Sequence, residues 1–238
     1  MILDRRGAPM ADQARAVTLA PMKGGNRTRA RWIAGGATLL AVAVFCWAWG
    51  SAPVNLRERI FPKNLAVVVP DSLYRSGQIR PNLIEGTLRD LDIDVIVDLS
   101  HDLGAHDASQ VAEKEAARKL GIELKRFPLN GSGTGEISSF VGAIEEIARD
   151  RREGRRVLVH CRAGDRRTGA VIAVYQMLVL GRDPAAARVE MERFTRRRGV
   201  ESTLTRFLAE HLDEIARGLL DAGVIERLPE SMTTSAGL

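Results

Sequence analysis

The sequence is poor in cysteine, with only Cys46 and Cys161 among its 238 residues. Cys46 lies inside an apolar run, so a disulfide between the two is implausible, and a domain held together by disulfides is excluded. No C-x-x-C pair is present, which argues against a thiol–disulfide oxidoreductase. No group of His, Cys and Asp has the sequence spacing of metal ligands, so we expect neither a metal nor another cofactor.

Most of the chain also lacks an excess of charge, although its pI is about 9.7. Residues 1–31 carry seven basic and two acidic side chains, a net charge of +5, and the remainder has 28 of each sign. The basic character therefore belongs to the N-terminal tail, and we expect no nucleic-acid partner. With 45% hydrophobic and 27% charged residues, the composition is typical of globular proteins.

A long segment without any charge follows this tail. With Trp32 and Gly50, the apolar run over residues 33–49 reaches 19 residues, close to the ~20 that a helix needs to cross a bilayer. Its tryptophans lie toward the ends, as interfacial aromatics do. The basic tail predicts a single-pass helix at a bacterial inner membrane, with the C-terminal domain in the periplasm. The alternative is a cleaved signal peptide, for which Met22 would be a suitable start.

The pattern after this segment alternates between apolar runs and helical periodicity, without internal repeats. Such alternation predicts an α/β domain with a central, mainly parallel sheet flanked by helices. We expect a basic tail (1–31), a transmembrane segment or signal anchor (32–50), a linker (51–64), the folded domain (65–220) and a C-terminal tail (221–238). Strands are predicted at 65–69, 72–76, 94–100, 122–129 and 155–160, and helices at 82–91, 109–120, 138–152, 168–180, 184–197 and 202–219.

The stretch HCRAGDRRTG, residues 160–169, places the second cysteine among arginines and glycines. It follows a buried strand and precedes a helix, so it lies at the carboxyl end of a central strand, where open α/β sheets bind ligands. A tight turn into a helix N-terminus directs several backbone N–H groups at one point, and such a nest binds anions. Gly164 frees the backbone to curl, and Gly169 permits close packing. The stretch is therefore suited to a tetrahedral dianion.

Cys161 and Arg167 are the reactive groups of this stretch. A helix N-terminus and nearby cations can lower a cysteine pKa from ~8.5 into the range of roughly 3.5–7.5. A thiolate under a bound phosphoryl group is an in-line nucleophile. The planar guanidinium of Arg167 matches two phosphate oxygens and would stabilise them in the transition state. We expect Thr168 to hydrogen-bond the sulfur and His160 to orient the loop.

The stretch resembles the H-C-x-x-G-x-x-R-[ST]-G signature of the cysteine-dependent protein-tyrosine and dual-specificity phosphatases. The resemblance covers about residues 64–198 and favours the small bacterial, membrane-anchored branch of the family. It implies a dual-specificity-phosphatase-like fold, with Cys161 as the nucleophile and Arg167 as the phosphate clamp. Further stretches that resemble the family are LYRSGQIRP (73–81), VIVDLS (95–100), GIELKRFPL (121–129) and VEM (189–191).

The general acid is missing from the position that the resemblance implies. The family usually has an Asp on a loop some thirty residues before the cysteine, whereas the window here reads FPLNGSGTGE, with Asn130 near the expected place. An amide cannot protonate a leaving oxygen. Candidate replacements are Glu136, Asp165, Asp102 and Asp107, each of which could also serve as a helix-terminal, ion-pairing or turn residue.

Other residues near the signature complete the predicted site. Arg75 and Gln78 could line it or could cap a strand. The predicted catalytic residues are Cys161, Arg167, Asp165 and Glu136, and the predicted substrate-binding residues are His160, Arg162, Ala163, Gly164, Arg166, Thr168 and Gly169.

These observations predict a membrane-anchored phosphatase that hydrolyses phosphomonoesters through a phosphocysteine intermediate. A linker of about fourteen residues spans at most roughly 50 Å, and the glycine-rich loop over 130–135 suits a wide mouth. Both features favour a phospholipid or glycolipid phosphate over phosphotyrosine. The alternatives are a protein-tyrosine phosphatase, or a catalytically weak pseudophosphatase that binds phosphorylated ligands. The expected partners are the membrane and a phosphorylated substrate, either a lipid headgroup or a phosphoprotein.

Overall fold

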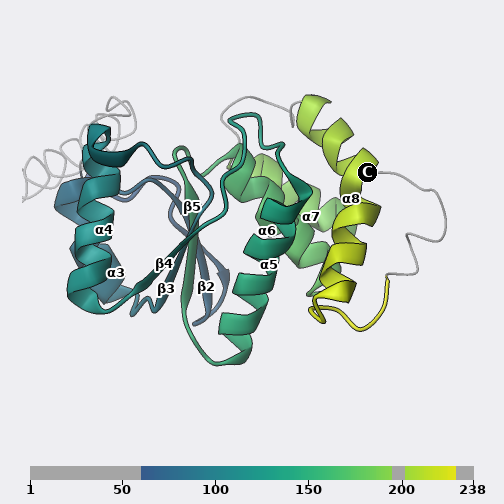
Figure 1. Ribbon diagram of the computed structural model, residues 1–238, viewed down its shortest axis with the longest axis horizontal. Coiled ribbons are helices and arrows are strands. Elements are labelled where there is room, and N and C mark those ends of the chain that lie inside the picture. The colour runs from purple at the N-terminus through teal and green to yellow at the C-terminus, as the bar shows by residue number, and fades with distance from the viewer. Residues whose placement is uncertain (1–59, 195–201, 229–238) are drawn as a thin grey trace, which may run out of the picture. The chain divides into compact units, whose positions relative to one another are not determined.

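The computed structural model describes residues 60–194 and 202–228 (Figure 1). The segment 32–50, predicted to cross a membrane, lies outside these ranges, as do the basic tail and most of the linker. Within the described ranges, no helix combines the length and the hydrophobicity that spanning a bilayer requires.

The elements follow one another largely as the sequence pattern predicts. In chain order they are β1 (Ala66–Val69), β2 (Leu73–Gly77), α3 (Pro81–Asp90), β3 (Val95–Asp98), a 3₁₀ turn (Gly104–His106), α4 (Ala108–Leu120), β4 (Glu123–Arg126), α5 (Ile137–Arg152), β5 (Val157–Cys161), α6 (Arg166–Leu178), α7 (Pro184–Arg193) and α8 (Ser202–Asp221).

Local sequence signals account for several helix ends. Pro81 begins α3, where its missing N–H costs no hydrogen bond. Asp107 precedes α4 and accepts the backbone N–H groups of Ser109 and Gln110, which is the usual function of an N-cap carboxylate. Gly121 ends α4 in the left-handed conformation that glycine adopts readily.

The strands form one sheet in the order β1-β2-β5-β3-β4. Strands β2, β5, β3 and β4 pair in parallel, and β1 pairs with β2 in the antiparallel sense. The predicted α/β fold is confirmed, with a sheet that is mixed because of β1. Every residue of β5 is buried, as expected for a central parallel strand covered on both faces.

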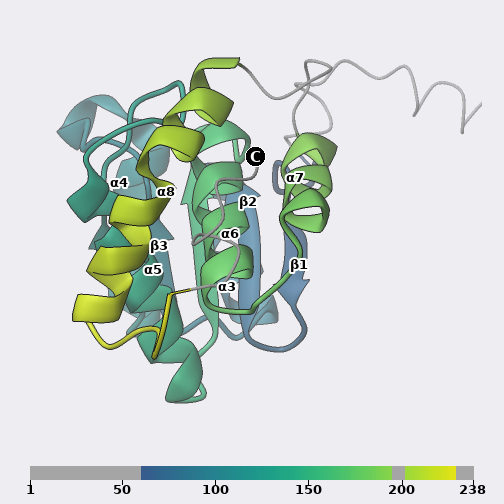
Figure 2. The same ribbon diagram turned by 90° about the vertical axis from the view of Figure 1, so that its right-hand side faces the viewer.

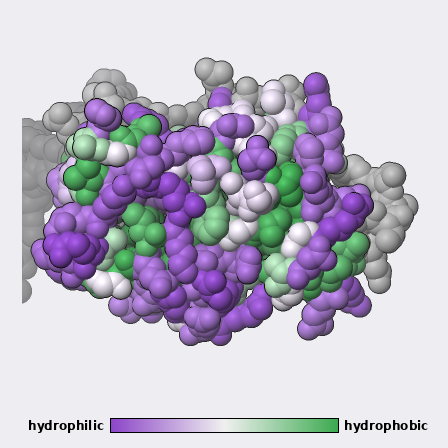
Figure 3. All heavy atoms as spheres, in the orientation of Figure 1, coloured by the Kyte–Doolittle hydropathy of each residue, from purple (hydrophilic) through white to green (hydrophobic). Residues whose placement is uncertain are grey.

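Helices cover both faces of the sheet, and each layer encloses its own apolar cluster (Figure 1). Residues of α3 and α4 pack on one face, and residues of α5, α6, α7 and α8 enclose the larger cluster on the other. Helix α6 packs against α7, and α5 packs against α8 (Figure 2). On the face seen in Figure 3, hydrophilic residues form most of the described surface, with hydrophobic residues in smaller groups between them.

The parallel strands place four loops at one edge of the sheet. The segments after β2, β3, β4 and β5 all leave from the carboxyl ends of their strands, and β5 lies between β2 and β3. This edge is where α/β sheets bind ligands, and residues 160–169 lie on it.

Candidate active site

A tight loop over residues 161–167 runs from Cys161, the last residue of β5, into the first residues of α6. The backbone N–H of Gly164 points at the sulfur of Cys161, with N and Sγ 3.3 Å apart. Gly164 has a φ of +67°, and a Cβ at this position would lie 2.4 Å from the backbone nitrogen of Gly77. Only glycine fits this conformation and this close approach to β2.

The Cys161 thiol lies at the floor of the loop, with 1% of the residue exposed. Burial by itself raises the pKa of this thiol, but polar groups around the sulfur outweigh it. The Thr168 hydroxyl, the Arg167 guanidinium and the backbone N–H groups of Thr168 and Asp165 together hold the pKa of Cys161 below its ordinary value. The surroundings of the sulfur therefore favour the thiolate, which is the nucleophilic form.

A cavity of about 440 Å³ is lined by the side chain of Arg167 and by residues of the neighbouring loops. Arg167 also reaches back to the strand β3 end, where its Nη1 lies 3.4 Å from the carbonyl oxygen of Leu99. Basic side chains form a large part of the wall. The lining residues are Lys63, Gln78, Arg80, Pro81, Ser100, His101, Leu103, Asp107, Ser109, Gln110, Arg162 and Arg167.

Arg75 of β2 supports the loop from below and is fully buried. Its Nη2 donates to the carbonyl oxygen of Gly164 at 2.9 Å, and its guanidinium lies 3.8 Å from the ring centroid of Phe194. Glu190 of α7 approaches to 3.9 Å. Burial lowers the pKa of Arg75 to about 10, which still leaves it charged at neutral pH. Arg75 is not among the residues that line the cavity, whereas Gln78 is.

Residues before β1 also contact the loop, although the sequence pattern assigns them to the linker. Asn64 donates from Nδ2 to the carbonyl oxygen of Ala163 at 2.8 Å. The carbonyl oxygen of Lys63 accepts the backbone N–H of Gly77 at 2.7 Å. The backbone N–H of Gln78 points at the carbonyl oxygen of Arg162, 3.3 Å away. The loop is therefore held by two segments that are distant from it in the sequence, the residues before β1 and the end of β2.

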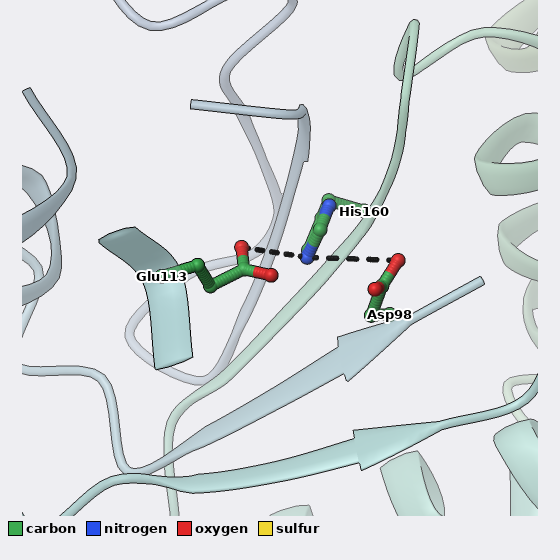
Figure 4. Close-up of side chains that lie close together, drawn as sticks. All are labelled: Asp98, Glu113 and His160. Atoms are coloured by element: carbon green, nitrogen blue, oxygen red, sulfur yellow. Dashed lines mark ion pairs between the residues drawn. The ribbon is translucent and has the colours of Figure 1, made fainter. Parts of the chain in front are cut away.

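His160 faces the layer of α4, away from the side on which Cys161 packs. Its Nε2 forms an ion pair with Glu113 of α4 at 2.9 Å and lies 3.9 Å from Asp98 of β3 (Figure 4). Burial by itself lowers the pKa of His160, but Glu113 and Asp98 raise it to about 9. His160 therefore carries a positive charge directly behind the nucleophile.

The four acid candidates lie in different surroundings. Asp107 lines the cavity with Arg167, whereas Glu136 lines a separate groove of about 320 Å³ with residues of α8. The backbone N–H of Gly104 and the cations Lys114 and Arg126 lower the pKa of Asp102 to about 2, and Asp102 does not line the cavity. Asp165 directly precedes α6, and its backbone N–H helps to lower the pKa of Cys161.

The other predicted residues of the loop differ in exposure. The Arg162 side chain is 71% exposed, lines the cavity and lies 3.4 Å from Asp107, whereas Arg166 approaches the carbonyl oxygen of Gly131 at 3.4 Å. Thr168 and Gly169 are buried in the first turn of α6.

The sequence pattern missed Lys63, Arg80 and His101 as cavity residues. His101 had a usable signal, because it follows a buried strand at the same sheet edge as Cys161. Lys63 had none, because it precedes an edge strand.

Two groups of side chains in the described ranges bring three metal-ligating atoms within 4.8 Å of one another. One consists of Asp98, Glu113 and His160, and the other of Glu123, Glu146 and Asp150. Basic side chains already pair with each group: Arg126 binds Asp98, and Lys125 and Arg149 bind Glu146. These ion pairs supply the compensating charge that a metal would bring.

The comparison with known families agrees with this geometry. Residues 64–210 match the family described as "PTP-SAK: Swiss Army Knife protein, DSP-PTPase phosphatase domain". The chain belongs to this family. It therefore contains a cysteine-dependent phosphatase domain of the dual-specificity type. A search of curated protein sequences found no match.

Solved structures show the same fold. TpbA from P. aeruginosa is 22% identical with a TM-score of 0.51, and the match covers 66% of this chain and 91% of TpbA. The catalytic core of the PP-IP phosphatase SIW14 from S. cerevisiae is 21% identical with a TM-score of 0.55, covering 68% and 94%. PTPMT1 is 15% identical with a TM-score of 0.54, covering 66% and 99%. Each match thus covers about two thirds of this chain and nearly the whole of the solved chain.

Proposed function

We propose that this phosphatase hydrolyses phosphomonoesters through a phosphocysteine intermediate on Cys161. The observation that carries the proposal is the buried thiol at the end of β5, whose surroundings favour the thiolate. The sulfur attacks phosphorus in line while the backbone N–H groups of the loop and the Arg167 guanidinium bind the other phosphate oxygens. Water then attacks the phosphocysteine, releasing inorganic phosphate and regenerating the thiolate.

The leaving oxygen needs a proton in the first step, and we propose Asp107 as its source. Of the four candidate carboxyl groups, Asp107 alone lines the cavity with Arg167. Its Oδ1 accepts two backbone N–H groups of α4, and Oδ2 lies on the side of Arg162. These contacts orient the carboxyl group while leaving it at the cavity wall, where a leaving group would depart.

The proposed chemistry has a direct test in Cys161→Ser. We expect turnover of an aryl phosphate to be lost while inorganic phosphate still binds, because Arg167 and the backbone N–H groups remain. Near-native turnover by Cys161→Ser without added metal would overturn the mechanism. Absence of turnover by the unmodified protein, with phosphate binding intact, would instead support a pseudophosphatase.

We further propose a phosphorylated lipid or glycolipid as the substrate, presented by the membrane to which residues 32–50 would anchor the chain. Basic side chains line the cavity, among them Lys63, Arg80 and Arg162. They would pair with a lipid headgroup that carries more than one anionic group. Leu103 lies among them with 44% of the residue exposed, as a contact to the apolar edge of a bilayer would require. PTPMT1 has been solved in complex with PI(5)P, and TpbA with pTyr, so both substrate classes occur on this fold.

The two substrate classes differ in a measurable way. We expect a higher kcat/KM on phosphatidylglycerophosphate or lipid A in mixed micelles than on phosphotyrosine peptides. A peptide preference of about a hundredfold or more, about 2.7 kcal/mol in transition-state binding, would favour the protein-tyrosine phosphatase instead.

A further inference from the structure

Two neighbouring residues of β5 serve different layers of the fold. Side chains alternate along a strand, so Cys161 joins the cluster on the side of α6, and His160 faces α4. Asp98 is the register partner of His160 in β3 and points to the same layer. Asp98 and His160 are buried, with at most 1% of each exposed.

Glu113 occupies a position of α4 that the sequence pattern would reserve for an apolar residue. The buried stripe of α4 consists of residues 110, 113, 116 and 117, the spacing of one helix face. A carboxylate buried in this stripe is unfavourable unless it is paired. Glu113 meets this condition through the ion pair with His160 at 2.9 Å and through the Gln78 amide, whose Nε2 donates at 3.2 Å.

The carboxylates around His160 favour its charged form. Its Nε2 lies 2.9 Å from Oε1 of Glu113 and 3.9 Å from Oδ1 of Asp98 (Figure 4). His160 Nε2 meets no hydrogen-bond geometry with either carboxylate, but two carboxylate oxygens this close stabilise a positive charge on the ring. Asp98 is also paired with Arg126 of β4 at 3.0 Å. Arg126 also pairs with Asp102 at 2.9 Å, so its guanidinium is shared and does not balance both buried carboxylates. An imidazolium at His160 supplies the positive charge that a neutral imidazole would not.

We propose that Glu113 is a positioning residue of the phosphatase reaction: through its ion pair with His160 it keeps an imidazolium behind Cys161 and so favours the thiolate. The inference rests on the nucleophilic role proposed for Cys161. The charged groups that face His160 are Glu113 from α4, Asp98 from β3 and the adjacent thiolate of Cys161. A positive charge next to the sulfur stabilises its anionic form, and loss of Glu113 would remove the group that holds this charge in place.

The test is the pH dependence of Cys161 alkylation by iodoacetamide in the full chain and in Glu113→Gln. Both proteins carry Cys46→Ser, so that Cys161 is the thiol observed. We expect the midpoint for Glu113→Gln to move upward by about one pH unit, which slows alkylation about tenfold below the midpoint. The acid limb of kcat for an aryl phosphate should move in parallel. KM should stay within about twofold, because Arg167 and the loop N–H groups are unchanged.

The matched control is Glu115→Gln, two residues further along α4. Glu115 is exposed and pairs with Arg118 on the same helix, so its replacement should leave both pH profiles unchanged. Glu113→Asp keeps the negative charge and should restore part of the shift. An unchanged midpoint in Glu113→Gln would overturn the proposal, and so would a loss of activity that is equal at all pH values.

A measurement on the unmodified chain covers the case in which Glu113→Gln does not fold. The ¹⁵N chemical shifts of the His160 ring should show both nitrogens protonated at about pH 7.5, in contrast to an exposed histidine. A neutral His160 ring at that pH would overturn the proposal. The Cys161→Ser assay separates this inference from the proposed function, because retained turnover there contradicts the nucleophile and not the Glu113–His160 pair.

Discussion

The individual residues of this site have distinct tasks that their chemistry explains. Cys161 is buried, but the polar groups around its sulfur lower its pKa and favour the thiolate. Arg167 places a planar cation at the cavity wall. Arg75 adds a buried guanidinium that holds the loop through the carbonyl oxygen of Gly164. One cation thus lies at the cavity wall and another contacts the loop backbone, so the site suits a dianion and its charged transition state.

Asp107→Asn tests the proposed proton donor at this scale. Asparagine is as good an N-cap as aspartate, so α4 should begin unchanged while the ionisable group is lost. We expect turnover of an alkyl phosphate to fall by about 100-fold or more and that of an aryl phosphate much less, because aryl oxygens leave without much protonation.

The control for this variant is Glu136→Gln, which removes a carboxyl group from the separate groove and should affect both substrates equally little. If Asp107→Asn slows both substrates alike, Asp107 is not the acid. His101, which also lines the cavity, would then be replaced by glutamine in the same assay.

Arg75→Lys tests the support under the loop. An ammonium group cannot both donate to Gly164 and stack flat on Phe194. We expect the free energy of unfolding to fall by about 1–3 kcal/mol, measured by urea unfolding, and kcat/KM to fall with it. Arg188→Lys in the exposed pair with Glu192 should change the free energy of unfolding by less than about 0.5 kcal/mol. Equal effects in the two variants would contradict the supporting function of Arg75.

At the scale of elements, the site depends on how β2, β5 and α6 meet. The 161–167 loop passes so close to β2 that a Cβ on Gly164 would collide with the backbone of Ser76 and Gly77. Helix α6 begins at Arg166, two residues earlier than its predicted start, so its first free N–H groups lie inside the loop. The close approach of strand and loop directs these groups toward the sulfur.

Gly164→Ala tests this arrangement. The added methyl group requires a shift of the loop, and its φ of +67° is strained for alanine. Because a misplacement of about 1 Å can cost 10²-fold in rate, we expect kcat/KM to fall by about 100-fold or more. The matched control is Gly86→Ala in α3, where nothing lies within 4 Å of the added Cβ. That variant should keep its activity and gain about 0.5–1 kcal/mol in the free energy of unfolding. A fully active Gly164→Ala protein would refute the steric argument.

At the scale of the whole molecule, the charge asymmetry of the chain bears on where the phosphatase domain resides. The net charge of +5 precedes the apolar segment, and the remainder of the chain is balanced. Positive residues flanking a membrane segment remain on the cytoplasmic side. The proposed arrangement therefore places the phosphatase domain outside the cytoplasm, beside the membrane surface.

Fusions to the C-terminal end of the chain, after Leu238, test this topology. Alkaline phosphatase is active only after export, whereas a fluorescent protein of the common type fluoresces only in the cytoplasm. We expect alkaline phosphatase activity without fluorescence. Fluorescence without alkaline phosphatase activity would place the domain in the cytoplasm. That result would remove the main support for a lipid substrate on the outer face of the membrane.

The sequence by itself determined the α/β fold and the order of strands and helices, and it predicted the nucleophile and its arginine. These features depend on near neighbours, because strand alternation, helical periodicity and a loop signature are each read within about twenty residues.

The sheet order and the acid candidate could not be read in this way. Tertiary structure alone brought Asn64 to Ala163, Arg75 to Gly164 and Glu113 to His160. These pairs are distant in the sequence and meet only because β5 lies between β2 and β3, with α4 packed on one face. The side chains in these pairs are polar, and a local sequence pattern does not show whether such a residue is exposed or buried. Only the packing of the fold decides which partner each of them meets.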